Sequence, residues 1–433
     1  MAARIDIFLM RCATSTFSGI SGCVMNYSLG TPVVLILVLS SLLSRAQTIS
    51  NSPYSLYGVG TLQGKSTALN RSLSATGIAV RDPLNLNTVN PASNTSIEYP
   101  TQIFEAGFFV EAGDYYTEEA STTYGSGNVT SLNAWFRFSR RWAGTVGIAP
   151  FSNMDYTISS RRRIGTDGGS SVTYWGNGGL SQFYFGNGFQ VTKNLSVGVT
   201  GSFIFGSLNK NEEVTSGLGT GIILTDRTYI NAVNLDFGAQ YTFFFKENTK
   251  LTVGIIYDDH LRLNTSSKRY ALRETDTIYS KSNSIDDYTL PSRYGAGLAF
   301  ATPRSLLATD ITFAEWSSAR VDDDTRLRDT FGFSMGYRYK GDPDADTYWG
   351  TIQLSTGIYY RENYLVLENQ AFADWGWSAA IGFPVSGNLG TVNLSYNHNQ
   401  TGTLNNGLMR YRNHVFSIDV TFRDLWGMRR RYD

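Results

Sequence analysis

The segment V-F-S-I-D-V-T-F at residues 415–422, near the C-terminus, predicts a β-strand with two different faces. Its apolar and aromatic residues stand at every second position, as Phe416, Ile418, Val420 and Phe422. The positions between them hold mostly polar residues, Ser417, Asp419 and Thr421. Successive side chains of a strand point to opposite faces, so this strand meets an apolar environment on one side and a polar one on the other.

The same alternation recurs along most of the chain, for example at residues 195–205 and 251–257. Gly is frequent at 43 residues, aromatic residues make up 14% and charged residues only 17%, yet the mean hydropathy is −0.19. Only every second residue of a membrane barrel meets lipid, which gives this composition. The sequence therefore predicts a transmembrane antiparallel β-barrel of about 14 strands, with 12 to 16 allowed; a soluble β-sandwich with an aromatic core is the alternative. The expected strands are roughly 102–112, 131–140, 143–151, 154–164, 180–191, 195–207, 228–245, 250–264, 268–280, 291–302, 305–316, 327–339, 349–361, 372–384, 389–398 and 413–424.

The N-terminus predicts a secretory signal peptide of residues 1–46. An apolar run at residues 31–43 is too short to be a comfortable membrane helix, and Ala46 ends a stretch of small residues that suits cleavage. The positive residues lie far upstream of this run, so we expect the true start to be near Met25. Cleavage after Ala46 removes both cysteines, three Arg and one Asp, which leaves 33 basic and 35 acidic residues. That balance indicates neither a nucleic-acid partner nor an anionic membrane surface.

The mature chain divides into an irregular segment, a barrel and a short tail. Residues 47–100 are rich in Gly, Asn, Ser and Pro but hold enough apolar residues to pack against something, which predicts a plug. We expect the barrel at 101–426 and a tail at 427–433. Short connections at 152–153, 246–248 and 386–388 read as periplasmic turns. The longer polar or Gly-rich connections, expected to be extracellular loops, are 113–130, 165–179, 208–227, 317–326 and 399–412.

Aromatic and glycine residues give two further expectations. Seven tryptophans fall near the expected strand ends, where an amphipathic ring suits the lipid headgroup boundary. They are Trp142, Trp175, Trp316, Trp349, Trp375, Trp377 and Trp426. Glycines within strands are where kinks or bulges arise, with Gly147, Gly186 and Gly198 as examples.

The sequence offers no enzyme site, metal site or cofactor site. His260, His398 and His414 lie far apart in the sequence, with no partner at the spacing of metal ligands. The run Asp342, Asp344 and Asp346 does not continue as a calcium loop, so we interpret it as a solvated turn.

Three short stretches resemble the FadL/TodX family of outer-membrane transporters, in a form like that of Bacteroidetes. Asn90, Pro91 and Ala92 are similar to the N-P-A motif that closes the family's N-terminal hatch. The stretch at residues 308–317 resembles a late barrel strand of the family, and residues 422–426 resemble its C-terminus. The resemblance implies a 14-stranded barrel plugged by its N-terminal segment, with a gap in the wall through which hydrophobic molecules reach the bilayer.

Two functions follow from this resemblance. The first is a passive channel for long-chain fatty acids or similar hydrophobic molecules, with lateral exit. The second is a FadL-shaped docking or shuttle protein, such as the PorV-like component of type IX secretion, which binds protein partners and passes no solute. Either way, the chain is expected in the outer membrane of a Gram-negative bacterium after Sec-type export. Its partners would be outer-membrane lipid and lipopolysaccharide, a hydrophobic ligand and, during biogenesis, the barrel-assembly machinery.

Overall fold

The computed structural model describes residues 52–163, 169–215, 221–273, 276–321, 325–385 and 389–425, and all of them belong to one compact unit. The predicted signal peptide, the turn expected at 386–388, Trp426 and the C-terminal tail lie outside the described residues. None of the described helices is long and apolar enough to cross a membrane.

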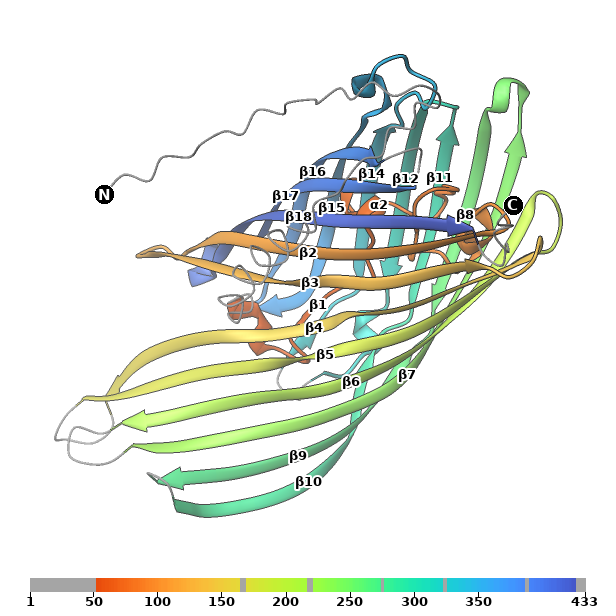
Figure 1. Ribbon diagram of the computed structural model, residues 1–433. Helices are drawn as coiled ribbons and strands as arrows, with labels where there is room; N and C mark the ends of the chain where they lie inside the picture. The colour runs from red at the N-terminus through yellow and green to blue at the C-terminus, as the bar shows by residue number, and fades with distance from the viewer. Residues whose placement is uncertain are drawn as a thin grey trace, which may run out of the picture. The chain divides into compact units, whose positions relative to one another are not determined.

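The fold is a closed antiparallel barrel of 14 strands (Figure 1). Its sheet has 18 hydrogen-bonded segments, but β1 belongs to the plug and the two-residue β13 is an addition to β15. β8 and β9 are two halves of one broken strand, because β7 pairs with both of them. β10 and β11 are likewise two halves of one strand, because they pair with β9 and β8 respectively. The segments are β2 (Thr101–Tyr116), β3 (Ser121–Arg137), β4 (Trp142–Arg163), β5 (Gly169–Gln190), β6 (Leu195–Thr215), β7 (Ile222–Phe244), β8 (Lys250–Asp258), β9 (Leu261–Arg273), β10 (Asp276–Leu290), β11 (Arg293–Ala301), β12 (Ser305–Ala314), β13 (Arg326–Leu327), β14 (Thr330–Tyr339), β15 (Gln353–Leu367), β16 (Gln370–Val385), β17 (Gly390–Gly402) and β18 (Arg410–Leu425).

The C-terminal strand closes the barrel against the first wall strand. β18 pairs with β2 along its whole length, from Arg410 opposite Tyr116 to Leu425 opposite Thr101. Its outward side chains, including Phe416 and Phe422, are about half exposed, whereas Asp419 is completely buried on the inner face. The alternation read from the sequence thus corresponds to the outer and inner faces of the wall.

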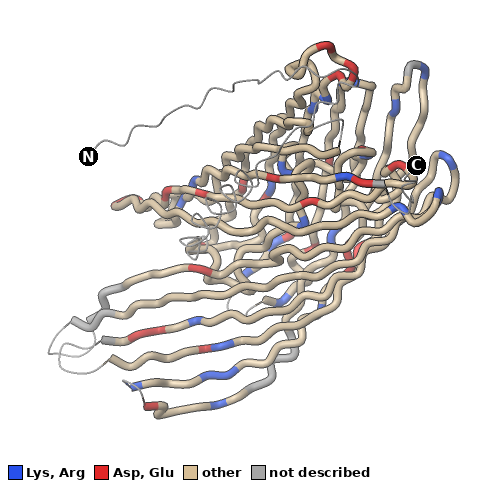
Figure 2. The backbone as a smooth tube through the Cα atoms, viewed as in Figure 1, with Lys and Arg blue, Asp and Glu red and all other residues tan. Residues whose placement is uncertain are grey.

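The strands β4 to β7 are 21 to 23 residues long, about twice the 9 to 11 residues that cross a bilayer. Several expected loops were wrong for this reason. Within the described residues, 113–130, 169–179, 208–215 and 221–227 are largely strand, because strands that rise into water carry polar side chains on both faces and lose the alternating pattern. The connection expected at 399–412 is shorter than predicted and spans residues 403–409 between β17 and β18. Figure 2 shows charged residues along these distal parts. Lys210 lies on β6 and Arg269 on β9.

The expected turn at Ser152–Asn153 is also wrong. β4 continues through it, and the break in pattern is a register shift between Pro150 and Ser152 against β5. A bulge shifts the side-chain alternation by one residue without ending the strand. By contrast, residues 246–248 do form a turn, the 3₁₀-helix η3 (Lys246–Asn248) between β7 and β8.

The plug, residues 52–100, lies inside the barrel with little regular structure (Figure 1). Its elements are η1 (Pro53–Leu56), β1 (Thr61–Leu62), the short helix α2 (Ala68–Ser72) and η2 (Pro91–Ser96). Many of its side chains are almost fully buried, including Leu69, Leu73 and Ile78. A segment with so few internal backbone bonds depends on the wall for its hydrogen-bond partners.

Candidate functional site: the plug and the seam between β3 and β4

Asn90, Pro91 and Ala92 join the plug to the wall. The Asn90 carboxamide caps η2 by accepting a hydrogen bond from the Ala92 N–H at 3.0 Å. Its Nδ2 donates to the carbonyl of Ile78 at 2.7 Å and lies 3.3 and 3.2 Å from the carbonyls of Ala239 and Ile255 on β7 and β8. One side chain therefore links two parts of the plug to two wall strands. Its role as a family hatch motif remains a proposal.

The wall carries glycine where this motif touches it. A Cβ at Gly198 of β6 would lie 2.4 Å from the Pro91 carbonyl carbon, and one at Gly238 of β7 would lie 2.1 Å from Asn90 Oδ1. Gly186 similarly faces the plug, because a Cβ there would lie 3.1 Å from Asn94 Nδ2. These glycines permit close approach of the plug. The pairing of β5 and β6 is regular at Gly186 and Gly198, so the expectation of a bulge there was wrong.

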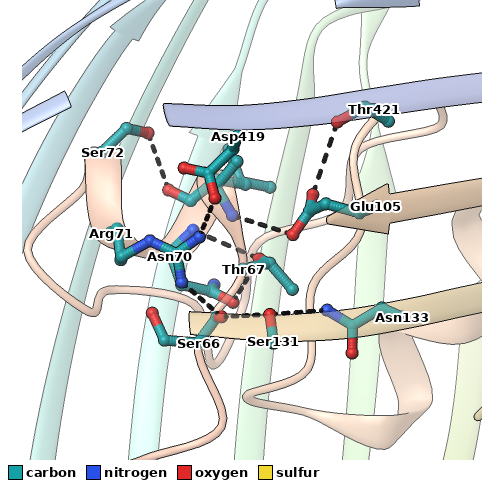
Figure 3. Close-up of polar contacts among 12 residues, drawn as sticks. Ser66, Thr67, Asn70, Arg71, Ser72, Glu105, Ser131, Asn133, Asp419 and Thr421 are labelled. Atoms are coloured by element: carbon teal, nitrogen blue, oxygen red, sulfur yellow. Dashed lines mark hydrogen bonds and ion pairs between the residues drawn. The ribbon is translucent and has the colours of Figure 1, made fainter. Parts of the chain in front are cut away.

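A buried ion pair holds α2 against the closing strands (Figure 3). Arg71 pairs with Asp419 of β18, whose side chain is fully buried, and Arg71 Nη1 donates to the Ser66 carbonyl at 2.6 Å. Glu105 of β2 accepts a hydrogen bond from the Ala68 N–H at 3.1 Å, at the start of the helix. A buried ion pair with additional hydrogen bonds is costly to break from one side, so this contact fixes the plug firmly.

Other ties reach different sides of the wall. Lys65 pairs with Asp236 of β7. Asp310 of β12 accepts the backbone N–H groups of Gly77 and Ile78 at 2.6 and 2.9 Å. The plug is therefore held from β2, β7, β12 and β18 together. The residues that hold the plug were not predicted from the sequence. The sequence feature that could have indicated them is an acidic residue at an inward strand position between apolar ones, as in I-D-V at 418–420.

The wall has a seam between β3 and β4. These strands pair only from Leu132 opposite Ile148 to Arg137 opposite Ala143. In the part of the chain that the structure describes, residues 121–131 of β3 and 149–163 of β4 do not pair with each other, and the two strands run apart in Figure 1. The seam begins where β4 carries its bulge at Pro150–Ser152.

The plug covers the β4 side of this seam. β1 pairs Thr61 with Asn153 and Leu62 with Ser152, and the Gln63 N–H donates to the Phe151 carbonyl at 2.8 Å. Ser55 Oγ also exchanges hydrogen bonds with the backbone of Asp155. Gly60, with φ of +87°, precedes β1 and allows it to approach β4 closely.

An apolar cluster lies inside the barrel behind the seam, toward the end of the barrel where β4 to β7 extend. Its wall residues include Met154 of β4, Leu180 of β5 and Ile204 of β6, and Val59 of the plug is buried among them. Trp316 stacks on Tyr364 with ring centroids 3.9 Å apart and belongs to the same cluster. Trp316 was expected at the lipid boundary, but the loop after β12 folds inward and buries it.

The remaining predicted residues are distributed over the surface. Phe416, Ile418, Val420 and Phe422 are exposed on the outer face of β18, as a lipid-facing strand requires, and lipid contact remains a prediction. His398 and His414, far apart in sequence, lie opposite each other on β17 and β18 with ring centroids 5.0 Å apart. The described residues contain no group of three His, Cys, Asp or Glu side chains arranged to hold a metal.

Comparison with known proteins gives one family and a set of similar structures. The BamG family model matches residues 29–433. The CymD monoaromatic hydrocarbon channel is 14% identical, with 86% of this chain and all of that chain covered and a TM-score of 0.58. A FadL homologue of Pseudomonas aeruginosa (13% identical, 84% and 99% covered, TM-score 0.60) and the toluene transporter TodX of P. putida (15%, 84% and 99%, 0.56) are also similar. No curated protein matches the chain.

Proposed function

The chain belongs to the BamG family, and from its geometry we propose that it resides in the outer membrane of a Gram-negative bacterium and passes hydrophobic small molecules sideways into the bilayer. The observation that carries this proposal is the unpaired seam between β3 and β4, with an apolar cluster directly behind it. Transfer of apolar surface from water into apolar surroundings is favourable, so this cluster attracts such a solute. The seam then offers a route that avoids the polar headgroup layer.

The plug sets how this route opens. Val59 fills part of the apolar cluster, while Thr61 and Leu62 occupy the edge of β4. A solute of similar polarity can replace Val59 if the segment 53–63 moves away from the wall. The anchors at Arg71, Lys65 and Asn90 hold the rest of the plug meanwhile, so opening requires only the first part of the plug to move.

The solute class follows from the lining. The cluster is made of aliphatic and aromatic side chains, which suits long-chain fatty acids or monoaromatic hydrocarbons. The similar solved structures include channels and transporters named for monoaromatic hydrocarbon and toluene, which supports the same class. Movement down a concentration gradient needs no cofactor, so we propose passive diffusion.

A reversible lock on the seam tests this proposal. Thr61 and Asn153 are directly opposed in an antiparallel pair, where the spacing suits a disulfide, and Thr61→Cys with Asn153→Cys would supply the only thiols of a chain cleaved after Ala46. We expect the oxidised variant to lose uptake of labelled oleate and toluene, measured in vesicles with purified protein, and to regain it with a reductant.

The matched control ties the plug elsewhere. Ser74 and Ser378 of β16 have their hydroxyl oxygens 2.9 Å apart, so Ser74→Cys with Ser378→Cys links the plug to the wall away from the seam. Uptake by this oxidised control should equal that of the unmodified protein. Undiminished uptake through the Thr61–Asn153 lock, or no protein-dependent uptake at all, would contradict the proposal.

A second candidate is a closed barrel that binds other envelope proteins. The family name points to the barrel-assembly machinery, and the plug is held on several sides by buried polar contacts, as a rigid scaffold would be. A docking or shuttle protein of a secretion system would be one form of this second candidate. Co-purification of the full chain with barrel-assembly proteins, together with absence of solute uptake, would favour it over the channel.

A further inference from the structure

A cavity of about 200 Å³ lies between the plug and the wall, at the end of the barrel opposite the long strand extensions. The plug supplies one side through residues 79–83 and 95–98. The other side comes from the strand ends next to the β5–β6, β7–β8 and β11–β12 turns, at residues 190–196, 242–252 and 299–306. Neither the seam nor the apolar cluster contributes to this cavity.

The cavity is basic. Arg81, Lys193 and Lys250 line it, and Glu98 is the one carboxylate among its lining residues. Lys193 and Lys250 are exposed at the rim, and Lys250 Nζ lies 5.8 Å from the centre of the Phe244 ring. The three cations come from the plug and from two separate turns, so their charges surround the cavity.

Arg81 has no acidic partner. Its guanidinium donates to Gln240 Oε1 at 2.9 Å and to Thr95 Oγ1 at 2.8 Å, and lies 3.4 Å from the Ala92 carbonyl. In the described part of the chain no carboxylate lies within 4 Å of it, in contrast with Arg71 and Lys65. The plug thus places the positive charge of Arg81 beside the cavity. The guanidinium has hydrogen-bond acceptors, but no carboxylate balances its charge.

A second arginine adds to this charge. Arg137 of β3, which is 5% exposed, donates to the Thr95 carbonyl at 2.5 Å, so both guanidinium groups bind the same plug residue. Burial, and then the proximity of Arg137, lowers the pKa of Arg81 to about 10, so Arg81 still carries its charge at neutral pH. A partly buried cation beside a buried one, with no counter-ion, is unfavourable, and a bound anion relieves that cost.

The other walls are apolar and the space is limited. Ala79, Ala299, Ala301 and Leu306 form part of the lining. Drug-sized ligands occupy roughly 300 Å³ or more, so this cavity holds a small anion or a headgroup and not a whole lipid. Cations arriving from three directions suit a tetrahedral oxyanion, whereas a carboxylate is matched by one guanidinium fork.

We propose that this cavity is a binding site for a phosphate-class oxyanion, either the headgroup of an anionic phospholipid or free phosphate. The plug supplies Arg81 from within, and Lys193 and Lys250 close over the anion from the rim. The apolar walls accept the first carbons of an acyl or glycerol group, which favours the lipid source. The site does not depend on movement of any solute through the seam.

The test titrates the full-length protein in a non-ionic detergent with two probes, dihexanoyl phosphatidylglycerol and inorganic phosphate. Lys193→Gln with Lys250→Gln removes the rim charges, both on exposed side chains that leave the fold intact. We expect affinity to fall about tenfold in this variant and to fall with added salt. Lys246→Gln, an exposed lysine of the β7–β8 turn that does not line the cavity, is the matched control and should bind as the unmodified protein does.

The two probes separate the sources. Tighter binding of the phospholipid than of phosphate identifies a lipid headgroup, and the reverse order identifies free phosphate. Dihexanoyl phosphatidylcholine, which has no net charge, should bind more weakly than its anionic counterpart. The inference is overturned if neither probe binds, or if the double variant retains the affinity of Lys246→Gln.

Discussion

Single buried charges determine how the plug is held. Asp419 is completely buried at an inward position of β18, and its partner Arg71 comes from the plug almost 350 residues earlier in the chain. A buried carboxylate is expensive unless a cation or hydrogen-bond donors meet it. Asp236 and Asp310 are also buried carboxylates that bind the plug. Asp236 pairs with Lys65, and Asp310 accepts hydrogen bonds from two backbone N–H groups.

Removing the charge of Asp419 tests whether a single buried ion pair holds the plug. Asp419→Asn leaves Arg71 buried beside a neutral side chain, so we expect the free energy of unfolding to fall by about 3 kcal/mol, measured by urea unfolding in detergent micelles. The plug should also become more sensitive to protease.

An exposed ion pair is the control for this change. Asp226 pairs with Arg269 at the distal ends of β7 and β9, where the arginine side chain is 55% exposed. Asp226→Asn should cost about 1 kcal/mol or less. Equal effects of the two substitutions would show that burial of the Arg71–Asp419 pair does not matter for the plug.

At the scale of elements, the contact of η2 with β6 shows why a wall strand carries glycine. Gly198 faces inward and the plug backbone occupies the place that a side chain would take. Strand glycines normally weaken a sheet, so their presence indicates close approach of another backbone. The wall and the plug are therefore complementary at the level of main-chain atoms.

Replacing glycine by alanine on each face of β6 tests whether only the inner face contacts the plug. Gly198→Ala places a Cβ 2.4 Å from the Pro91 carbonyl carbon, and we expect a loss of about 1 to 3 kcal/mol in unfolding free energy and a displaced plug. Gly201→Ala, three residues further along the same strand, places a Cβ 3.8 Å from Leu235 Cδ2, an ordinary contact distance, and should be tolerated. Unfolding of both variants under identical conditions is the measurement. A tolerated Gly198→Ala would mean that η2 is free to shift.

For the whole molecule, an outer band of exposed apolar side chains surrounds the barrel. It includes Phe108 on β2, Phe203 on β6, Ile311 on β12 and Val420 on β18. In water such a surface would drive association, whereas in a bilayer it contacts lipid tails. The apolar band therefore faces outward, whereas the ion pairs that hold the plug lie on the inner face of the wall.

A charge in this band tests the orientation in lipid. Val420→Arg should cost about 2 to 4 kcal/mol near the bilayer midplane, measured by unfolding from phospholipid vesicles. Val191→Arg makes the same change in the β5–β6 turn at similar exposure, 53% against 47%, and should cost about 1 kcal/mol or less. Similar tolerance at both positions would contradict a membrane location of the barrel.

The sequence by itself determined the barrel, because alternation is local. The pattern at Phe416–Phe422 sets which side chains face outward, and repetition of that pattern sets the approximate strand count of 14. The bulge at Pro150–Ser152 and the polar ends of β4 to β7 were misread because the same alternation is lost at a bulge and in water. The composition of residues 47–100 was enough to indicate a packed segment.

Only the tertiary structure decided where two wall strands stay unpaired and which contacts hold the plug. The pairing of Arg71 with Asp419, the seam between β3 and β4 and the basic cavity at Arg81 each join residues distant in the chain. The sequence around one residue of such a pair does not specify the other residue. A polar residue at an inward strand position gives the same sequence pattern whether it contacts water, the plug or a ligand. Those contacts arise when the closed wall and the plug fold around each other.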